Sequence, residues 1–253
     1  MSSGSANAFI IATEASLVYN HISGNMEATI SSSFYSLHEV IFMREFADEI
    51  KQYLTPANLV IILICIVVFF VDKILIASGT DISDYGAVGW KQVIEDKEFY
   101  RILSYMFLHG SLLHLFNNML VLLFVGSAVE KLLGSGKYLV NYFMSGIIAG
   151  VVSVYYNMWR YNHTISATRT LVVSVGASGA VFGTVGALLW IVLANKGRIE
   201  GISIRRMIMF LVLSFYAGFT ATGIDNAAHV GGLFFGFFSS MILYNRRRLR
   251  NES

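Results

Sequence analysis

Three apolar stretches of the sequence carry polar side chains of the types that acyl transfer requires. Ser178 lies in the run SVGASGAVFG, between small residues and glycines. A serine becomes a nucleophile when a base takes its proton, and His229, in the run DNAAHVGG, is of the usual type for that base. His114 and Asn118, in the run HGSLLHLFNNM, are four residues apart, so both fall on one helix face and could stabilise an oxyanion. The amide N–H of Ser178, at a predicted helix start, is a further unpaired donor.

Each of these residues also has a simpler interpretation. A serine between small residues in an apolar helix more often serves helix packing than catalysis. His109 and His114 could be metal ligands, although the sequence has no HExxH motif and no cysteine cluster that would support zinc. Asp225, four residues before His229, could complete a triad, but its place at the edge of an apolar segment equally suits a helix cap. The joint presence of nucleophile, base and oxyanion donors therefore carries more weight than any one of them.

The composition indicates that these residues lie in a membrane protein. The 253 residues are 55% hydrophobic and only 13% charged, whereas a soluble domain has about 25% charged residues. The mean hydropathy is +0.62. A net charge of +2 gives no indication of nucleic-acid binding, and the single cysteine, Cys65, cannot form a disulfide within the chain.

Six apolar segments are each near the length of about 20 residues that a membrane-spanning helix needs. We therefore expect an all-α membrane protein with a bundle of six transmembrane helices. In the first segment, Thr55 is a candidate N-cap and Pro56 suits the first helical turn. The predicted spans are 57–77, 104–129, 138–158, 174–194, 206–222 and 226–244.

The distribution of basic residues predicts the orientation of these spans. Ten Lys and Arg residues lie on the side that holds the loop between spans two and three, the loop between spans four and five, and the C-terminal end. The opposite side holds six, and the side richer in basic residues is expected to be cytoplasmic. The sequence thus predicts a multi-pass protein of the cell membrane with both termini in the cytoplasm.

The predicted topology brings the polar groups to a similar depth. Spans two, four and six begin on the outer side, and the candidate residues lie near these beginnings. Spans four and six also carry stripes of small residues at four-residue spacing, which let helix backbones approach closely. These stripes are Gly179, Gly183 and Ala187 in span four and Gly232, Gly236 and Ser240 in span six. Such contact would bring His229 within reach of Ser178.

The remaining segments give the domain organisation. Residues 1–55 are predicted to be a cytoplasmic N-terminal segment, with an amphipathic helix over about 34–54. Residues 56–245 form the predicted six-helix domain, and 246–253 form a basic cytoplasmic tail. The loop 78–103 is longer than a plain connector needs, and its aromatic side chains suit the membrane interface.

Four motifs, in this order along the chain, resemble those of the rhomboid family of intramembrane serine proteases. They are HGSLLHLFNNM, GSAVEKLLGSGK, GASGAVFG and AHVGGLFFG, and the resemblance covers about 57–244. It implies a six-helix bundle with a membrane-embedded first loop, here 78–103, and a catalytic dyad of Ser178 and His229. It also implies an oxyanion and substrate-binding region. The residues of that region are His114, Asn118, Gly176 and the Ser178 amide, with His109 in support.

The resemblance further implies that Glu130 and Gly134 form a structural turn after span two. The sequence departs from the family pattern at two places. Phe182 stands where the family often has a tyrosine that stacks on the catalytic histidine, and Tyr100 precedes Arg101 where the family often has tryptophan. Neither departure removes a reacting group.

The activity that the resemblance implies is cleavage of the transmembrane segments of other membrane proteins, within the lipid bilayer and without a cofactor. An alternative is a non-catalytic membrane quality-control protein on the same scaffold. A transporter that uses the buried polar groups as a relay is more distant, since it would be expected to show repeated halves or interrupted spans. Retention of both Ser178 and His229 favours the protease.

Overall fold

The computed structural model describes residues 44–45, 50–51, 53–165, 171–199, 202–220 and 223–245. The chain divides into two compact units, residues 1–52 and residues 53–253. In the first unit, residues 44–45 and 50–51 are helical. The rest of the amphipathic helix predicted over 34–54 lies almost entirely outside the described residues, as does the basic tail 246–253.

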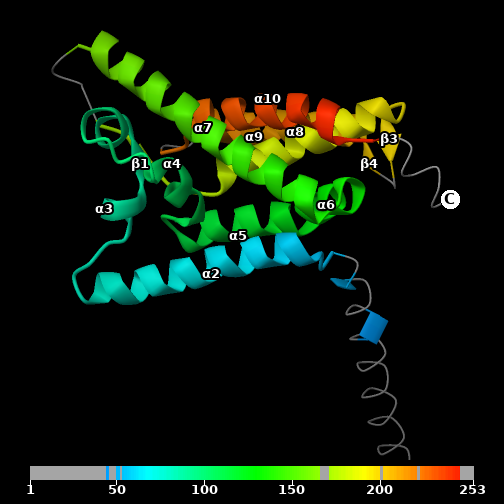
Figure 1. The fold of residues 1–253 in the computed structure, drawn as a ribbon, viewed down its shortest axis with the longest axis horizontal. Helices are drawn as coiled ribbons and strands as arrows, with labels where there is room; N and C mark the ends of the chain where they lie inside the picture. The colour runs from blue at the N-terminus through cyan, green and yellow to red at the C-terminus, as the bar shows by residue number, and fades with distance from the viewer. Residues whose placement is uncertain are drawn as a thin grey trace, which may run out of the picture. The chain divides into compact units, whose positions relative to one another are not determined.

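The second unit is built mainly from helices, most of which lie side by side in Figure 1, while the longest crosses the others obliquely. They are α2 (Pro56–Ala77), α5 (Leu112–Val121), α6 (Ser127–Leu133), α7 (Ser135–His163), α8 (Ser178–Ala194), α9 (Ile204–Thr220) and α10 (Asn226–Leu243).

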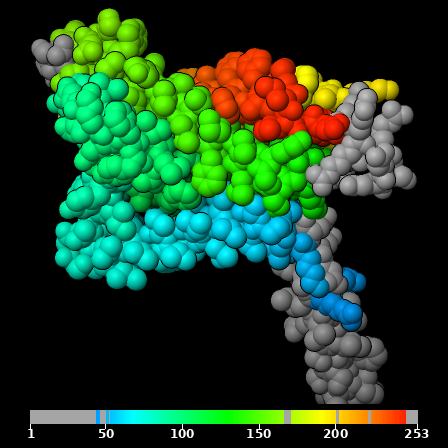
Figure 2. Space-filling view, in the orientation of Figure 1, coloured from blue at the N-terminus to red at the C-terminus, as the bar shows by residue number. Residues whose placement is uncertain are grey.

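Among the described residues, four helical stretches are long and apolar enough to cross a membrane: Pro56–Ala77, Leu112–Leu133, Ser135–His163 and Asn226–Leu243. Helix α8 is also apolar but shorter. In the space-filling view, α2 lies along one edge of the unit, and its apolar side chains, such as Val67 and Ile74, are exposed (Figure 2). Exposed apolar side chains along a spanning helix suit contact with lipid. The second unit is therefore a multi-pass membrane domain.

The second span begins later than the sequence pattern predicts. Residues 101–107 form a separate short helix, α4 (Arg101–Ser104), and a 3₁₀ turn, and the long helix starts only at Leu112. Ser111 is its N-cap, and the Ser111 hydroxyl accepts a hydrogen bond from the backbone N–H of His114 at 3.2 Å. The predicted start at 104 was wrong because the apolar pattern continues through residues that a serine cap separates from the helix. His109 consequently lies before this helix rather than inside it.

A π-helical turn, Leu122–Gly126, joins α5 to α6 within one continuous helical stretch. In such a turn the backbone hydrogen bonds join residues five apart, and the Leu122 carbonyl accepts from the Ser127 N–H in this way. The Asn58 side-chain amide, fully buried, donates to the carbonyl of Leu122 at 2.7 Å. The Tyr138 hydroxyl donates to the other end of that amide at 2.6 Å, so α2 and α7 are both anchored at this turn.

Glu130, in α6, caps the N-terminus of α2. Its carboxylate accepts from the backbone N–H groups of Ala57 and Asn58 at 3.0 and 2.8 Å, a favourable contact for an anion at a helix N-terminus. Thr55 occupies the predicted N-cap position and Pro56 the first turn, but the Thr55 side chain makes no capping bond. The predicted N-cap position of Thr55 is confirmed, but the capping hydrogen bonds come from the carboxylate of Glu130, which is distant in sequence.

Gly134 forms the turn between α6 and α7. Its φ of +83° lies in the left-handed region, which a glycine adopts without strain. Glu130 and Gly134 together therefore shape the structural turn that the resemblance implies after the second span.

Helices α8 and α10 are in direct backbone contact. A Cβ atom added to Gly232 would lie 1.9 Å from the carbonyl oxygen of Gly179, and one added to Gly236 would lie 1.8 Å from that of Gly183. No residue larger than glycine fits at these two positions without separating the helices. The close approach predicted from the stripes of small residues is confirmed, and it brings the first turns of α8 and α10 together.

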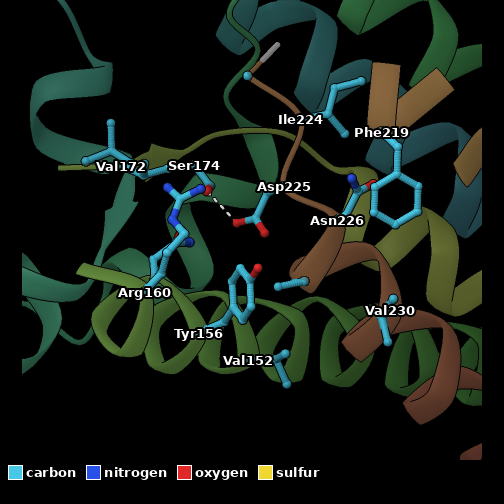
Figure 3. A pocket seen from close by; sticks show the side chains of 14 residues that line it. Val152, Tyr156, Arg160, Val172, Ser174, Phe219, Ile224, Asp225, Asn226 and Val230 are labelled. Atoms are coloured by element: carbon cyan, nitrogen blue, oxygen red, sulfur yellow. Dashed lines mark hydrogen bonds between the residues drawn. The ribbon is translucent and has the colours of Figure 1, made fainter. Parts of the chain in front are cut away.

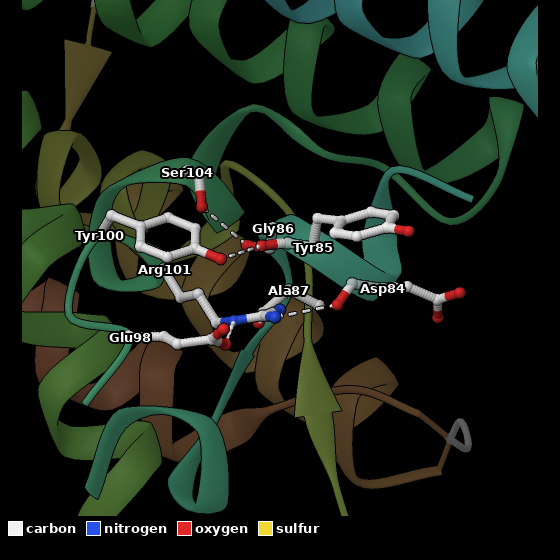
Figure 4. A network of polar contacts seen from close by, with 8 residues as sticks. All are labelled: Asp84, Tyr85, Gly86, Ala87, Glu98, Tyr100, Arg101 and Ser104. Atoms are coloured by element: carbon white, nitrogen blue, oxygen red, sulfur yellow. Dashed lines mark hydrogen bonds and ion pairs between the residues drawn. The ribbon is translucent and has the colours of Figure 1, made fainter. Parts of the chain in front are cut away.

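The segment that follows α2 contains short elements: α3 (Ser83–Gly86), β1 (Val88–Gly89), a π-helical turn (Lys91–Glu95) and α4. Arg101 lies at its centre and is only 5% exposed. Its guanidinium donates to the carbonyls of Ala87 and Asp84 at 3.0 and 2.9 Å and to the carboxylate of Glu98 (Figure 4). One side chain thus holds three points of the segment together.

Two short antiparallel strand pairs complete the described part of the fold. Strand β1 pairs with β2 (Val173–Ser174), which ties the segment around Arg101 to the residues just before α8. Strands β3 (Arg198–Ile199) and β4 (Ile202–Ser203) form the connection from α8 to α9.

Candidate active site

Ser178 and His229 lie within hydrogen-bonding distance of each other. Ser178 is the first residue of α8, and His229 lies in the first turn of α10. The distance between His229 Nε2 and Ser178 Oγ is 2.9 Å. His229 is 8% exposed, whereas Ser178 is half-buried. The geometry suits proton transfer from the serine to the imidazole.

Phe182 holds the plane of the His229 ring. The two rings are stacked, with centroids 4.2 Å apart and an angle of 10° between their planes. Phe182 lies one turn after Ser178 on α8, so the helix that carries the serine also orients the histidine. The other ring nitrogen, Nδ1 of His229, has no hydrogen-bond partner among the residues that the structure describes.

Asp225 accepts hydrogen bonds through its carboxylate from groups other than His229. Its side chain caps α10, where it accepts from the backbone N–H of Ala228 at 3.0 Å. It also accepts hydrogen bonds from the hydroxyls of Ser174 and Ser153. In the described part of the chain, its carboxylate makes no hydrogen bond to the imidazole of His229. Of the interpretations that the sequence left open, the helix cap is confirmed, and the arrangement is a Ser–His pair without a carboxylate on Nδ1.

His114 lies beside the serine. A Cβ atom added to Gly176 would come within 2.6 Å of Cε1 and 2.8 Å of Nε2 of the His114 ring, and 3.7 Å from Ser178 Oγ. Gly176 has a φ of +132°, a conformation that other residues rarely adopt, and its N–H donates to the Tyr105 carbonyl at 2.9 Å. Glycine is thus required here both by the backbone and by the space that the imidazole fills.

Asn118 and His109 surround His114. Asn118 is 6% exposed, and its side-chain amide donates to the His114 carbonyl at 3.1 Å, so it must change partner to reach an oxyanion. His109 is 2% exposed and contacts the His114 ring at a centroid distance of 5.2 Å with the planes at 68°. His109 therefore supports the position of His114 rather than facing Ser178 directly.

The backbone of α8 offers further donors beside the serine. The N-cap residue is Ala177, which has no side chain that could accept from the first amide groups of the helix. The start of α8 thus presents amide N–H groups and the positive end of the helix dipole next to Ser178 Oγ. Together with His114, these groups could stabilise the oxyanion that forms when Ser178 Oγ attacks a carbonyl carbon.

Sequence reasoning missed Ser153 and Ser174, the two serines that bind Asp225. Ser174 is half-buried and lies four residues before Ser178, just as Asp225 lies four residues before His229. The equal spacing gains meaning only once Ser178 and His229 are known to be in contact, so the sequence alone provides no signal for these two serines.

Comparison with known proteins places this chain among related sequences. A family model for the rhomboid domain matches residues 96–246. The rhomboid protease GluP of Bacillus subtilis (strain 168) is 33% identical over 180 residues, which cover 70% of this chain and 33% of GluP. RHOMBOID-like protein 4 of Arabidopsis thaliana is 32% identical over 181 residues, covering 69% of this chain and 42% of that protein.

One of the related proteins is named as inactive. Inactive RHOMBOID-like protein 8 of Arabidopsis thaliana is 31% identical over 159 residues, covering 61% of this chain and 41% of that protein. The matched regions span about a third to a half of the length of these relatives.

Proposed function

This chain belongs to the rhomboid family, and we propose that it is an intramembrane serine endopeptidase that cleaves transmembrane segments of other membrane proteins. The observation that carries the proposal is the 2.9 Å contact between His229 Nε2 and Ser178 Oγ at the start of two touching helices. The similarity to GluP, a rhomboid protease, supports the same activity.

The proposed reaction begins when His229 Nε2 takes the proton of the Ser178 hydroxyl. Oγ then attacks the carbonyl carbon of the scissile peptide bond, and the carbonyl electrons move to the oxygen. The amide of Ser178 and the side chains of His114 and Asn118 stabilise that oxyanion. His229 next donates its proton to the departing amine, leaving an acyl ester on Ser178. Water, deprotonated by His229, attacks the ester and restores the serine.

The site works in this proposal as a dyad. In a Ser–His–Asp triad, a buried carboxylate fixes the tautomer and orientation of the histidine. Here the stacked Phe182 ring provides the orientation, and the glycine contacts of α10 fix the helix that carries His229. Phe182 lacks the hydroxyl that a tyrosine would add, but stacking does not require it.

We also propose six spans with both termini in the cytoplasm, in which α8 and α9 are the fourth and fifth spans in chain order and complete the set with the four longer helical stretches. A helix of 17 residues, such as α8, is about 25 Å long at ~1.5 Å per residue, shorter than a hydrocarbon core of ~30 Å. Ser178 at its start therefore lies below the outer surface. The short elements of 78–103 fit a first loop embedded at that interface.

The substrate in this proposal is a transmembrane helix that unwinds locally near its outer end. A helical peptide bond is shielded by its own turn, so the scissile bond must be extended to reach Ser178. Small residues at the cut site suit the space left beside His114 and Gly176, where even one added Cβ has no room. No cofactor takes part in these steps.

Cleavage of a single-span model substrate by the purified full chain in a bilayer tests the proposal. The expected products are two fragments cut near the outer end of the span. A protein that binds the substrate without cleaving it would support instead a non-catalytic quality-control role; one relative is named inactive.

Asn118→Ala is expected to slow cleavage by about 10²–10³-fold, the usual effect of losing one oxyanion donor. The His114 imidazole and the Ser178 amide remain, so labelling of the serine by a phosphonate should persist at a reduced rate. Steady-state cleavage rates of the two proteins on one substrate measure this.

Asn117→Ala is the matched control, because Asn117 is the neighbouring amide on the exposed side of α5. Its rate should equal that of the wild type. A rate for Asn118→Ala that matches this control would assign Asn118 a structural role only.

A further inference from the structure

A second polar pair lies four residues before the first. The Ser174 hydroxyl donates to Asp225 Oδ2 at 2.6 Å, while Ser178 and His229 are in contact at 2.9 Å. The sequence offset is the same in both pairs, so the strand that leads into Ser178 runs beside the approach to α10. Figure 3 shows the Ser174–Asp225 bond from the side of a cavity.

Asp225 joins three elements of the fold. Besides Ser174 of β2, its carboxylate accepts from the Ser153 hydroxyl of α7 and from the backbone N–H of Ala228 in α10. Hydrogen bonds to a carboxylate are stronger than those between neutral groups. Ser174 also pairs with Val88 in the β1–β2 ladder, so the cluster is tied to the segment around Arg101 as well.

We propose that Asp225 is a positioning residue, whose bond to Ser174 sets the distance between Ser178 and His229. The inference rests on the proposed protease function. Asp225 does not touch the reacting atoms and acts only through the backbone segments that carry the dyad.

The contacts on the other side of the dyad explain why such a bond is needed. Below Ser178 and His229, the backbones of α8 and α10 touch at Gly179 and Gly232. Above them, Gly176, with a positive φ, lies between Ser174 and Ser178, and its N–H donates to the Tyr105 carbonyl rather than to α10. Two helices that touch at one point can still pivot about it, so that contact does not by itself set the separation of Ser178 and His229. The Ser174–Asp225 bond supplies the second point.

The Ser174–Asp225 hydrogen bond can be removed without changing Ser178 or His229. A cavity of about 650 Å³ is lined by residues of α7, α9 and α10 and the segments between them, including Ser174 and Asp225 but neither Ser178 nor His229. Arg160 and Tyr156, both from α7, lie on the same side of it (Figure 3). Removal of the Ser174 hydroxyl therefore enlarges a cavity away from the reacting atoms.

Loss of the bond should lower the turnover number without changing substrate binding. A displacement of about 1 Å at a catalytic group can cost ~10²-fold in rate. We expect Asp225→Ala to lower kcat about 10²-fold and Ser174→Ala about tenfold, because Ser153 still holds the carboxylate in the latter. KM should stay within about threefold, and the rate of phosphonate labelling of Ser178 should fall in parallel with kcat.

The double variant isolates the bond. If Ser174 and Asp225 act through one contact, the double alanine variant should be no slower than Asp225→Ala alone, whereas independent effects would multiply. Ser78→Ala, which removes a hydroxyl bonded to the Leu75 carbonyl at the end of α2, serves as the control with wild-type kinetics.

Asp225→Asn is the conservative variant and should keep most of the activity. Its amide oxygen can still cap Ala228, and its side chain can still hydrogen-bond both serines. We expect a rate loss of less than about tenfold, or about 1.4 kcal/mol in the barrier. In a triad the corresponding amide costs about 10⁴-fold.

Three outcomes would overturn the proposal. Wild-type kcat in Ser174→Ala and Asp225→Ala would show that the bond does not set the distance between Ser178 and His229. A kcat loss matched by a lower thermal melting temperature and a raised KM would make Asp225 a stabilising cap alone. A loss in Asp225→Asn as deep as in His229→Ala would make it a catalytic residue. Failure of the protease function itself is distinguishable, because the wild type would then show neither cleavage nor labelling.

Discussion

Ser178→Ala is expected to abolish cleavage of a model transmembrane substrate while the protein remains folded. Loss of the nucleophile of a serine protease can cost about 10⁶-fold in kcat. The substitution removes one hydroxyl at the start of α8 and its contact to His229, at a cost of only about 1 kcal/mol in stability. Fragment formation over long incubation, with a thermal melt of the same sample, measures both effects.

Thr184→Val is the matched control for this variant. It removes a buried hydroxyl from the same helix, one that donates to the Ala180 carbonyl and lies well below the dyad. The control should cleave at close to the wild-type rate. Should Ser178→Ala cleave as fast as Thr184→Val, the assignment of the nucleophile is wrong.

His229→Ala is expected to lose both cleavage and phosphonate labelling of Ser178. A half-buried serine hydroxyl is a weak nucleophile unless a base takes its proton, and His229 is the base in contact with it. In the triad proteases, loss of the histidine costs about as much as loss of the serine, ~10⁶-fold in kcat.

The alanine variant also loses the stacking on Phe182, so the fold must be tested separately. His229→Gln keeps most of the volume and removes the base, and it should be equally inactive with a higher melting temperature than His229→Ala. Labelling of either variant at the wild-type rate would mean that another group activates the serine.

The contact between α8 and α10 was predictable from sequence because it follows from local patterns. Glycines at four-residue spacing on two apolar segments indicate close backbone approach, and the first glycine of each stripe lies close in sequence to Ser178 or His229, which places both beside that contact. The glycine spacing and the positions of Ser178 and His229 can each be read within one apolar segment, without knowledge of how distant segments pack. The stack of Phe182 on His229 follows from the same contact.

Contacts between distant segments were not predictable in this way. Glu130 caps α2 from more than 70 residues away, so Thr55 was the only visible candidate for that role. The start of α5 was misplaced because apolar residues continue across a break that only the cap geometry of Ser111 reveals.

The Ser174–Asp225 bond was missed for a related reason. Ser174 lies in a two-residue strand without helical periodicity, and nothing in the local pattern shows that its hydroxyl faces α10. The helix cap at Asp225 could be proposed from sequence, since a carboxylate at a helix start is a common arrangement. Its serine partners could not be proposed from sequence, because they depend on the packing of α7 against α10.

The most direct test of the central claim is to locate the phosphonate adduct on the chain. The full protein, reconstituted in a bilayer, is treated with a serine-directed phosphonate, digested and analysed by mass spectrometry. The account predicts a single adduct on Ser178 in the wild type and none in His229→Ala. An adduct on another serine, or an unlabelled chain that still cleaves a transmembrane substrate, would contradict it.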